Sequence, residues 1–295
     1  MSDTPIFRRL ALLGLGLIGS SVARAVKKHG LAGEIAGHAR SAETRAKALE
    51  LGFVDSVHED PAVAVAGADC VMICTPLGSY KSVAEAMAPG LAKGAIVTDV
   101  GSVKGSVIRD LAPLLPETVH FIPGHPLAGT EHSGPESGFA ELFEGRFCLL
   151  TPPPGADEAA IDRLTRLWQG MGSTVETMNA EHHDQVLAIV SHLPHLIAYT
   201  IVGTATDLED DLKSEVIKFS ATGFRDFTRI AASDPVMWRD VFLNNKEAVL
   251  NVIQRFNEDL TALQRAIRWG EADKLQDLFT RTRAIRRGII DANQA

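Results

Sequence analysis

Residues 124–134, GHPLAGTEHSG, combine groups that can carry a proton with a backbone that can approach a ligand closely. The imidazoles of His125 and His132 and the carboxylate of Glu131 are surrounded by glycine and other small residues. Small residues favour a loop whose backbone can lie against a bound molecule. An imidazole with a pKa near ~6.5 is suited to accepting a proton at neutral pH. The segment therefore predicts a loop that takes part in proton transfer.

A second stretch, residues 14–19 (GLGLIG), has the spacing G-x-G-x-x-G. It follows an apolar run that is typical of a buried strand, and it opens a segment with helical periodicity. In that context Gly14 allows a tight turn, Gly16 lets the backbone approach a pyrophosphate, and Gly19 allows helix and strand to pack closely. The stretch predicts a dinucleotide site, with a plain glycine turn in a core as the alternative.

The residues expected to meet the adenosine ribose contain no acid. An acid about 20 residues after the glycine turn is typical of NAD sites, whereas residues 37–41 read GHARS. Arg40 could face a 2′-phosphate, with Ser41 and Thr44 as further hydrogen-bond donors. Alternatively, Arg40 stacks on the adenine of either cofactor. The pattern favours tolerance of NADP beside NAD.

The elements that must position these residues follow from the periodicity of the apolar residues. Up to about residue 178, apolar runs alternate with helical segments, which predicts βαβ units and a mainly parallel sheet. From about residue 180 the periodicity is helical throughout. We therefore predict an α/β nucleotide-binding domain at 1–178 and an all-α domain at 179–295. Strands are expected within residues 7–13, 34–39, 69–76, 94–102, 119–125, 147–152 and 173–178.

Composition narrows the classes of partner. The 295-residue chain has a formal net charge of −8, which argues against nucleic acid or an anionic membrane as the main partner. Arg8, Arg9 and the apolar stretch after them resemble a signal peptide, but the glycines favour a strand and turn. We expect no apolar run of the ~20 residues that span a membrane. Three cysteines without a CxxC pair fit a reducing cytoplasm, and no cluster has metal-ligand spacing, so we predict no metal.

Six segments occur in one order: the glycine turn, ICTP at 73–76, DVGSVKG at 99–105, GHPLAGTEHSG, SHLPHLIA at 191–198 and GFRDFTRIAASDPVMWRD at 223–240. Together they resemble the prephenate/arogenate (cyclohexadienyl) dehydrogenases of tyrosine biosynthesis over nearly the whole chain. The last three segments are more specific than the glycine turn. The resemblance implies a Rossmann-type domain followed by an all-α dimerisation domain, a homodimer, a small-molecule substrate, and NAD or NADP as cofactor.

Enzymes of this family oxidatively decarboxylate prephenate to 4-hydroxyphenylpyruvate, or arogenate to tyrosine. Hydride leaves the ring carbon that carries a hydroxyl, the hydroxyl loses its proton, and loss of carbon dioxide makes the ring aromatic. The protein must therefore supply a proton acceptor at the hydroxyl, a cation for a carboxylate, and a nicotinamide held against the ring.

The resemblance names two catalytic residues. His125 accepts the proton, and Ser102 bridges the base, the hydroxyl and the nicotinamide. The alternative for His125 is a loop histidine that caps backbone groups. Ser102 can at the same time be the N-cap of the helix that follows. We expect Lys104 to be a solvated residue in the first turn of that helix.

The resemblance also places Arg229 at the substrate, where its planar fork would bind a carboxylate. Asp226 lies three residues earlier on the same helical face and is expected to hold the orientation of Arg229. Aromatic residues, among them Trp238, suggest that both lie in a pocket rather than at the surface. Glu131 either orients a histidine, meets the amino group of arogenate, or is a solvated loop carboxylate.

Four histidines at the start of the helical part have different expected roles. The resemblance places His195 at the substrate, with a satisfied core histidine as the alternative. His192, three residues earlier on the same face, is expected to support structure. Pro194 between them should kink the helix. His182 and His183 are expected at the surface.

The cofactor contacts implied by the resemblance are Gly14, Gly16, Leu17, Ile18, Gly19, Arg40, Ser41, Thr75, Pro76 and Ser102. NAD-preferring members of the family usually carry Asp where Ala39 stands, so the cofactor preference stays open. Because the helical pattern runs to the end of the sequence, we expect neither a fused chorismate mutase nor an added regulatory domain.

Two other functions remain as alternatives. A β-hydroxyacid dehydrogenase or imine reductase pairs similar domains but usually carries a lysine in the first helix of the second one, and residues 182–195 contain none. A non-catalytic dinucleotide-binding sensor would need only the glycine turn. The homodimer is also predicted from residues 236–269, which are more apolar than one helical stripe requires. The apolar residues are Val241, Phe242, Val249, Val252, Ile253, Phe256, Leu260 and Leu263.

Overall fold

The computed structural model describes residues 4–206, 215, 218–219 and 221–291. Packing divides the chain after Lys246 into two compact units, which are described separately below. Helices from the predicted second domain pack with the sheets in the first unit. The boundary predicted at 178/179 lies inside the first unit and stays a prediction.

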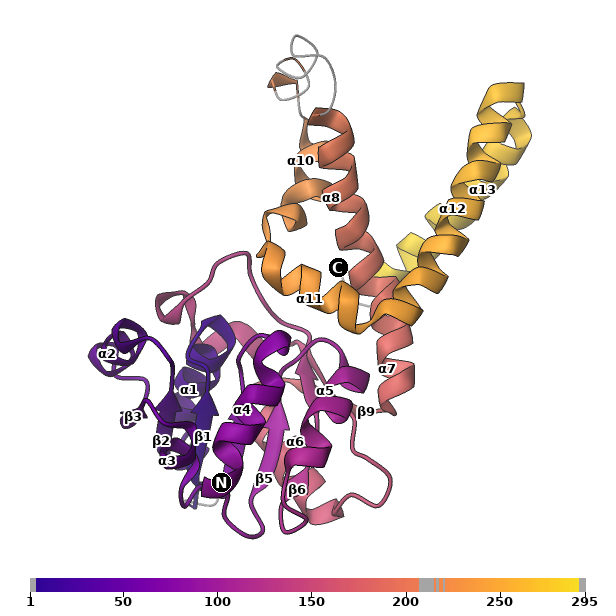
Figure 1. Ribbon diagram of the computed structural model, residues 1–295. Helices are drawn as coiled ribbons and strands as arrows, with labels where there is room; N and C mark the ends of the chain where they lie inside the picture. The colour runs from indigo at the N-terminus through magenta and orange to yellow at the C-terminus, as the bar shows by residue number, and fades with distance from the viewer. Residues whose placement is uncertain (1–3, 207–214, 216–217, 220, 292–295) are drawn as a thin grey trace. The chain divides into compact units, whose positions relative to one another are not determined.

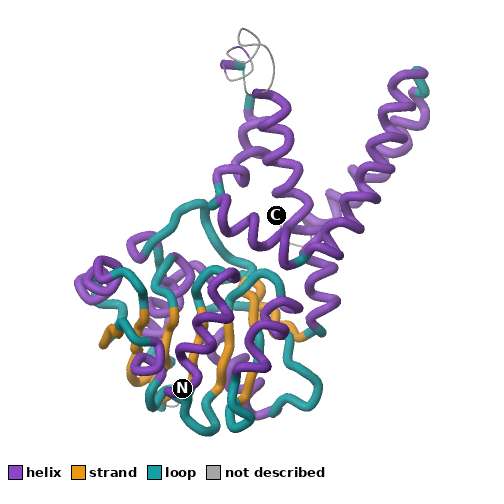
Figure 2. Tube along the Cα trace, in the orientation of Figure 1, coloured by secondary structure: helices purple, strands orange, loops and turns teal. Residues whose placement is uncertain are grey.

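The first unit is built on a six-stranded parallel sheet with the strand order β3-β2-β1-β4-β5-β6 (Figures 1 and 2). This order is the one found in dinucleotide-binding sheets, and it places the ligand outside the carboxyl ends of the strands. The strands are β1 (Phe7–Leu13), β2 (Ala32–His38), β3 (Ser56–His58), β4 (Cys70–Ile73), β5 (Ile96–Asp99) and β6 (His120–Phe121).

Helices bury both faces of this sheet (Figure 1). Alternate residues of β1 enter two separate apolar clusters: Leu10 and Leu12 pack with residues of α1 and α6, and Ala11 and Leu13 with residues of α4 and α5. A parallel sheet covered in this way reads as continuous apolar runs, as the sequence predicted. The helices are α1 (Leu17–His29), α2 (Ala42–Glu50), α3 (Pro61–Val65), α4 (Tyr80–Met87), α5 (Lys104–Leu111) and α6 (Glu158–Gly170).

The single strand expected at 119–125 is wrong, because the chain divides between two sheets there. β6 ends at Phe121, and β7 begins at Gly124 in a three-stranded sheet with the order β7-β8-β9. Pro123 lies between them and has no N–H to donate to a sheet. β7 runs antiparallel to β8, and β8 parallel to β9. These strands are β7 (Gly124–Pro126), β8 (Phe147–Leu150) and β9 (Thr174–Thr177).

The helical part begins with one long helix that contains a wide turn. A π-helical turn, Ala188–His192, immediately precedes α8, whose second residue is Pro194. Because Pro194 cannot donate its N–H to the preceding turn, the expected kink takes the form of this π-helical turn. The remaining helices of the first unit are α7 (Ala180–Leu187), α8 (Leu193–Thr206), α10 (Thr222–Thr228) and α11 (Pro235–Asn244).

The apolar segment 236–269 is two helices rather than one. α11 ends at Asn244, and α12 (Lys246–Trp269) begins after Asn245. The Asn245 side chain donates hydrogen bonds to the Asp184 carbonyl and to His192, so this residue ties the end of α11 to α7 and the π-helical turn. The second unit consists of α12 and α13 (Ala272–Asp291).

One helical run is long and apolar enough to cross a membrane by length and composition, namely Ala180–Thr206 with a mean hydropathy of 1.7. The expectation that no such run exists is therefore wrong. The run includes the buried residues His183, His192 and Ala198. Leu187 and Ala188 are buried as well, and 22% of the most apolar window of the run is buried in the structure.

Candidate active site

The ends of the strands bring the predicted site residues to one edge of the sheet. Gly14 follows β1, Thr75 follows β4, and Ser102 follows β5. His125 lies on β7, and the preceding residue, Gly124, donates its N–H to the carboxylate of Asp99 at the end of β5. The glycine turn and the histidine loop therefore meet where doubly wound sheets bind ligands.

The glycine turn has the geometry that its spacing predicted. Gly14 has a φ of +106°, and a Cβ there would lie 2.7 Å from the Cys74 carbonyl. A Cβ at Gly19 would clash with the Gly14 carbonyl oxygen, whereas a Cβ at Gly16 would meet open space. Gly16 caps α1 without a side-chain hydrogen bond, and the first turn holds no acid. Amide donors and the positive end of the helix dipole are thus left for an anion.

Thr75 adds a second feature that fits a bound dinucleotide. Its Oγ1 is buried and has no hydrogen-bond partner among the described residues. A buried polar atom without a partner is uncommon in folded proteins. Because Thr75 follows β4 directly beside Gly14, a cofactor hydroxyl or amide at the glycine turn could satisfy it. Pro76 next to it caps a short 3₁₀ turn, Leu77–Ser79.

Near the expected ribose site, Ser41 has a structural role, and Arg45 is a further residue that the sequence did not suggest. Ser41 Oγ accepts a hydrogen bond from the Thr44 N–H and caps α2. Arg40 is exposed and free to meet a ligand. Arg45, which the sequence did not suggest, donates hydrogen bonds to the carbonyls of Ala39 and Arg40 and pairs with Glu59 at 3.0 Å. Arg45 therefore fixes the backbone of the loop that would meet the ribose.

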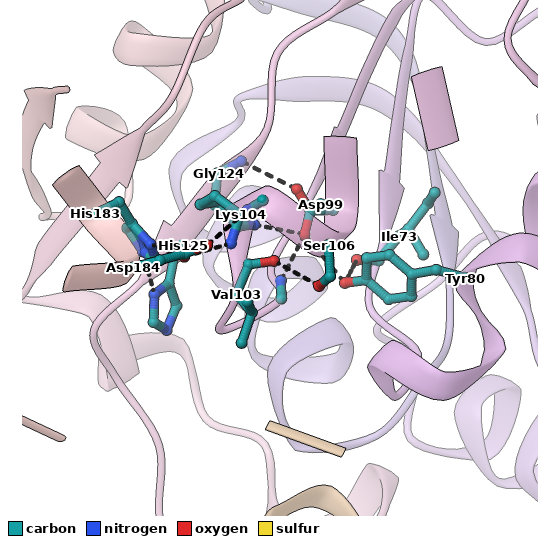
Figure 3. A network of polar contacts seen from close by, with 12 residues as sticks. Ile73, Tyr80, Asp99, Val103, Lys104, Ser106, Gly124, His125, His183 and Asp184 are labelled. Carbon is teal, nitrogen blue, oxygen red and sulfur yellow. Dashed lines mark hydrogen bonds and ion pairs between the residues drawn. The ribbon is translucent and has the colours of Figure 1, made fainter. Parts of the chain in front are cut away.

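His125 is buried and belongs to a chain of three side chains (Figure 3). Its Nδ1 lies 2.9 Å from Nε2 of His183, and Nδ1 of His183 lies 2.8 Å from Oδ1 of Asp184. A carboxylate only accepts, so His183 must donate from Nδ1 and accept at Nε2. His125 must then donate from Nδ1. Its Nε2 keeps a lone pair and has no hydrogen-bond partner among the described residues.

Burial, together with repulsion from Lys104 and from the neighbouring histidines, keeps His125 neutral. Burial is the largest cause, followed by His183, Lys104 and His192, and together they hold its pKa well below the ordinary value of 6.5. Burial also lowers the pKa of His183, although Asp184 opposes that shift. At neutral pH His125 is therefore an unprotonated imidazole with a free lone pair, which is the form that accepts a proton.

Two sequence expectations about polar residues near His125 are wrong. His183 is fully buried rather than at the surface, because it contacts His125. Lys104 is also fully buried rather than solvated, because its ammonium group lies 2.7 Å from Asp99 and donates to the Gly124 carbonyl. Helical periodicity alone could not reveal either residue, since their partners come from distant parts of the chain.

Ser102 does not cap α5. The residue at the cap is Val103, and the carboxylate of Asp184 accepts the N–H groups of Lys104 and Gly105 at 2.8 Å each. Ser102 is half-buried and makes no hydrogen bond with any described residue. Its hydroxyl is thus available to a ligand, and an aspartate on α7 performs the capping instead.

The second predicted histidine of the site stacks on the predicted tryptophan. His195 and Trp238 have ring centroids 3.6 Å apart and nearly parallel planes. His195 Nδ1 donates to the Ser191 carbonyl at 2.9 Å, so its Nε2 is an acceptor when the ring is neutral. His192 packs edge-on against Trp238 and lies behind the site, where burial lowers its pKa to about 4.

Arg229 has a different partner from the one expected. Its guanidinium lies 3.6 Å from the carboxylate of Glu131, and no ion pair joins it to Asp226 within the described chain. α10 ends at Thr228 and Arg229 opens a 3₁₀ turn, so the regular helical spacing between Asp226 and Arg229 stops there. The pair brings together the loop after β7 and the turn after α10. Asp226 is exposed.

Sequence reasoning missed several polar residues of the site. Asp99 offered a signal, because an acid at the end of an apolar strand lies at the ligand edge of a parallel sheet. Asp184 offered a weaker one, as an acid in the first turns of a helix.

Among the described residues, no cluster of three or more His, Cys, Asp or Glu could hold a metal ion.

The fold and the site are those of a dinucleotide-binding dehydrogenase with a doubly wound sheet. A neutral, buried histidine lies at the edge of the sheet where such proteins bind ligands. The family model for the prephenate dehydrogenase nucleotide-binding domain matches residues 22–177, and the model for the prephenate dehydrogenase dimerization domain matches residues 179–281. The chain therefore belongs to the prephenate dehydrogenase family. This assignment confirms the resemblance and the predicted fold class, and the two alternative functions do not fit it.

Proteins that are similar to this chain carry names consistent with this family. A cyclohexadienyl dehydrogenase of Zymomonas mobilis is 42% identical over 281 residues, which are 95% of this chain and 96% of that protein. The crystal structure of prephenate dehydrogenase from A. aeolicus, in complex with hydroxyphenyl propionate and NAD+, has a TM-score of 0.89 at 35% identity and covers 96% of this chain and 98% of that one. Synechocystis arogenate dehydrogenase has a TM-score of 0.81 at 28% identity, covering 95% and 99%.

Proposed function

We propose that this chain catalyses the NAD(P)-dependent oxidative decarboxylation of prephenate, arogenate or both, as a step in tyrosine biosynthesis. The family assignment and relatives named for each of these activities support the proposal. The observation that carries it is the state of His125, a neutral imidazole whose free Nε2 lies at the sheet edge that also carries the glycine turn.

The proton step belongs to His125. Nε2 takes the proton of the ring hydroxyl as hydride leaves the same carbon. His183 and Asp184 hold the ring in the correct tautomer and compensate the positive charge that forms on it. Ser102, whose hydroxyl has no described partner, donates or accepts a hydrogen bond at the substrate hydroxyl and at the nicotinamide.

The substrate's carboxylates require cations or donors. Arg229 is assigned to one carboxylate, with Glu131 as its partner in the ligand-free protein. The stacked pair of His195 and Trp238 is assigned to the ring, since a flat aromatic surface suits it. Asp226 has a weaker case than the other residues proposed for substrate binding, because it forms no ion pair with Arg229 among the described residues.

A bound nicotinamide nucleotide supplies the acceptor for hydride. The glycine turn would hold its pyrophosphate, Thr75 and Pro76 would line its nicotinamide half, and Arg40 and Ser41 would meet the ribose. Either cofactor is accepted on this proposal, because position 39 holds no acid and Arg40 is free to face a 2′-phosphate.

The proposal includes a cytoplasmic homodimer. The helical part matches a family model described as a dimerization domain. The helices of the second unit expose large apolar residues that a second copy would cover. These are Leu250, Leu260, Ile267, Trp269, Phe279 and Ile285.

One assay tests the proposed activity. Purified protein is mixed with prephenate or arogenate and with NAD+ or NADP+, and the appearance of reduced nicotinamide is followed by its absorbance. We expect turnover with at least one substrate, together with release of carbon dioxide in equal amount. Reduction without carbon dioxide release, or no reduction in any of the four mixtures, would contradict the proposal.

A further inference from the structure

Asp99 and Lys104 form a fully buried ion pair that the predicted chemistry does not use (Figure 3). Neither side chain is exposed, and their charged atoms lie 2.7 Å apart. Asp99 also accepts the N–H of Gly101 at 2.7 Å, the N–H of Gly124 at 3.2 Å and the hydroxyl of Tyr80 at 3.2 Å. All of its partners are donors, so Asp99 is an ionised carboxylate.

The two glycines are the direct neighbours of the two proposed catalytic residues. Gly101 precedes Ser102, and Gly124 precedes His125. Lys104 donates to the carbonyl of Gly124, and Asp99 accepts from its N–H, so the pair holds this residue from both sides. Asp99 accepts from Gly101 through the same oxygen that contacts Lys104.

Both glycines lie close to Asp99. A Cβ on Gly101 would lie 2.7 Å from a Leu77 methyl group and 2.9 Å from Asp99 Oδ2, and a Cβ on Gly124 would lie 3.2 Å from the main-chain carbonyl oxygen of Asp99. Gly101 therefore contacts the carboxylate of the pair, whereas Gly124 packs against the main chain of Asp99.

Stability alone is a poor reason to bury these charges. Desolvating an ion pair costs about as much as the pair returns, and apolar residues of similar volume often serve as well or better. The contacts made here are specific to two loops. We propose that Asp99 and Lys104 are positioning residues, which set the distance between the proton acceptor His125 and the hydroxyl of Ser102. This inference rests on the proposed function.

Lys104 of this pair also lowers the proton affinity of His125. The groups that face His125 are Lys104 on α5, Asp99 on β5, Cys148 on β8, and His183, Asp184 and His192 on the long helix. Among the cations, Lys104 lowers the pKa of His125 by repulsion. Loss of this positive charge should therefore raise that pKa and move the acid limb of the rate profile to higher pH.

The main test compares Lys104→Met with Lys104→Arg. Lys104→Met removes the charge and the bond to Gly124, and we expect kcat to fall about 10- to 100-fold, as a small misplacement of catalytic groups does. The acid limb of kcat/KM should move to higher pH, while the dissociation constant of the cofactor, measured by quenching of protein fluorescence, stays within a few-fold. Lys104→Arg keeps the charge and should leave the acid limb in place.

Two further variants separate geometry from charge and from stability. Gly101→Ala pushes against Asp99 without changing any charge, so kcat should fall with the acid limb unmoved. Arg163→Met is the matched control, because Arg163 pairs with Asp69 at 3.1 Å at the opposite edge of the sheet. It should lower thermal stability without changing kcat or the acid limb.

The inference would be overturned if Lys104→Met folds and its kcat and the acid limb of its kcat/KM profile equal those of the parent. If Lys104→Met does not fold, Gly101→Ala decides, and the kcat of the parent in that variant would overturn the inference. Titration of the histidines by NMR needs no turnover. An unchanged pKa of His125 in folded Lys104→Met refutes the electrostatic part, even in a protein that oxidises neither substrate.

Discussion

The properties of His125 come from its neighbours rather than from the loop that carries it. His183 and Asp184 determine which nitrogen holds the proton, and burial with Lys104 nearby determines that only one nitrogen does. Asp184 contributes twice, because the oxygen that accepts from His183 also accepts the N–H of Lys104. The hydrogen bonds among His125, His183 and Asp184 therefore fix both the tautomer and the orientation of the proposed base.

Replacing the proposed base tests this arrangement. His125→Asn keeps a planar polar side chain but removes the proton acceptor, and general base catalysis typically contributes ~10²–10⁴-fold. We expect kcat to fall within that range while the dissociation constant for NAD+ stays near the parent value. His132→Asn in the same loop is the control, since His132 is exposed and should leave kcat unchanged. A His125 variant within a few-fold of the parent would remove the residue from the mechanism.

Position 39 tests the proposed cofactor tolerance. Ala39→Asp places a carboxylate where it would accept bonds from a free ribose hydroxyl and repel a 2′-phosphate. We expect kcat/KM for NADP+ to fall and the preference for NAD+ to rise. Ala39→Asn has nearly the same shape without the charge and should shift the preference less. If the parent uses NAD+ alone and NADP+ is inert, the proposal of tolerance is wrong.

Among the elements, helix α7 and the π-helical turn after it join the helical part of the first unit to its sheets. Asp184 caps α5 through the amides of Lys104 and Gly105, and Asn245 donates to the carbonyl of Asp184 and to His192. Three buried histidines, His125, His183 and His192, lie along this junction. The junction is therefore sensitive to protonation.

We expect the free energy of unfolding to fall as the pH drops below about 6.5. The pKa of each of the three histidines is lowered in the folded chain, so the unfolded chain binds protons that the folded one does not. The stabilisation is complete above the unfolded pKa of 6.5 and is lost as the pH falls toward the folded values. His192, with a pKa of about 4, contributes roughly 2 kcal/mol of this loss near pH 5.

Urea unfolding at several pH values measures this effect. His192→Gln should reduce the dependence on pH, whereas His132→Gln at the exposed loop should leave it unchanged. A parent protein whose free energy of unfolding is level between neutral pH and pH 5 would show that these imidazoles are not held neutral.

The turn after α10 provides the proposed anchor for a substrate carboxylate. Arg229→Ala should raise the substrate KM about 10- to 100-fold, because a charged hydrogen bond is worth roughly 1.5–3 kcal/mol. Arg229→Lys should recover part of the loss, since an ammonium group keeps the charge without the fork. Arg225→Ala, an exposed arginine on α10, is the control. Equal KM values in all variants would place the anion site elsewhere.

The sequence predicted those features of the elements that depend on local pattern. The glycine turn and the parallel strands follow from residue type and spacing. The strand that divides at Pro123 and the helix that breaks at Asn245 depend on partners that periodicity does not reveal. The same holds for the site. Motifs proposed His125 and Ser102 as site residues, whereas His183 and Lys104 were misjudged because their contacts span many residues of sequence.

At the scale of the whole molecule, the second unit buries few apolar side chains of its own. Within its described residues, Val249 and Ala266 are the buried hydrophobic side chains, whereas several large apolar ones on α12 and α13 are exposed. Two helices with so little buried surface do not fold stably alone. A second copy of the chain is the partner that the family's dimerization domain suggests.

Light scattering should therefore find a dimer at micromolar concentration. Ile267→Glu puts a charge on the exposed apolar face of α12 and should shift the protein toward monomer with lower thermal stability. Asn251→Asp adds a negative charge at an exposed position on the other side of the helix and should leave the dimer intact. A parent that scatters as a stable monomer contradicts the proposed assembly.

The contact between His125 and His183 crosses the predicted boundary at 178/179, and this restricts how such a protein can be recombined in evolution. The nucleotide-binding part carries the residue that would take the proton, but the helical part carries the two side chains that determine its tautomer. Exchange of the helical part for that of another dehydrogenase would retain the cofactor turn and still deprive His125 of its orientation. The two parts can diverge in surface and in substrate pocket, yet they must inherit this contact together.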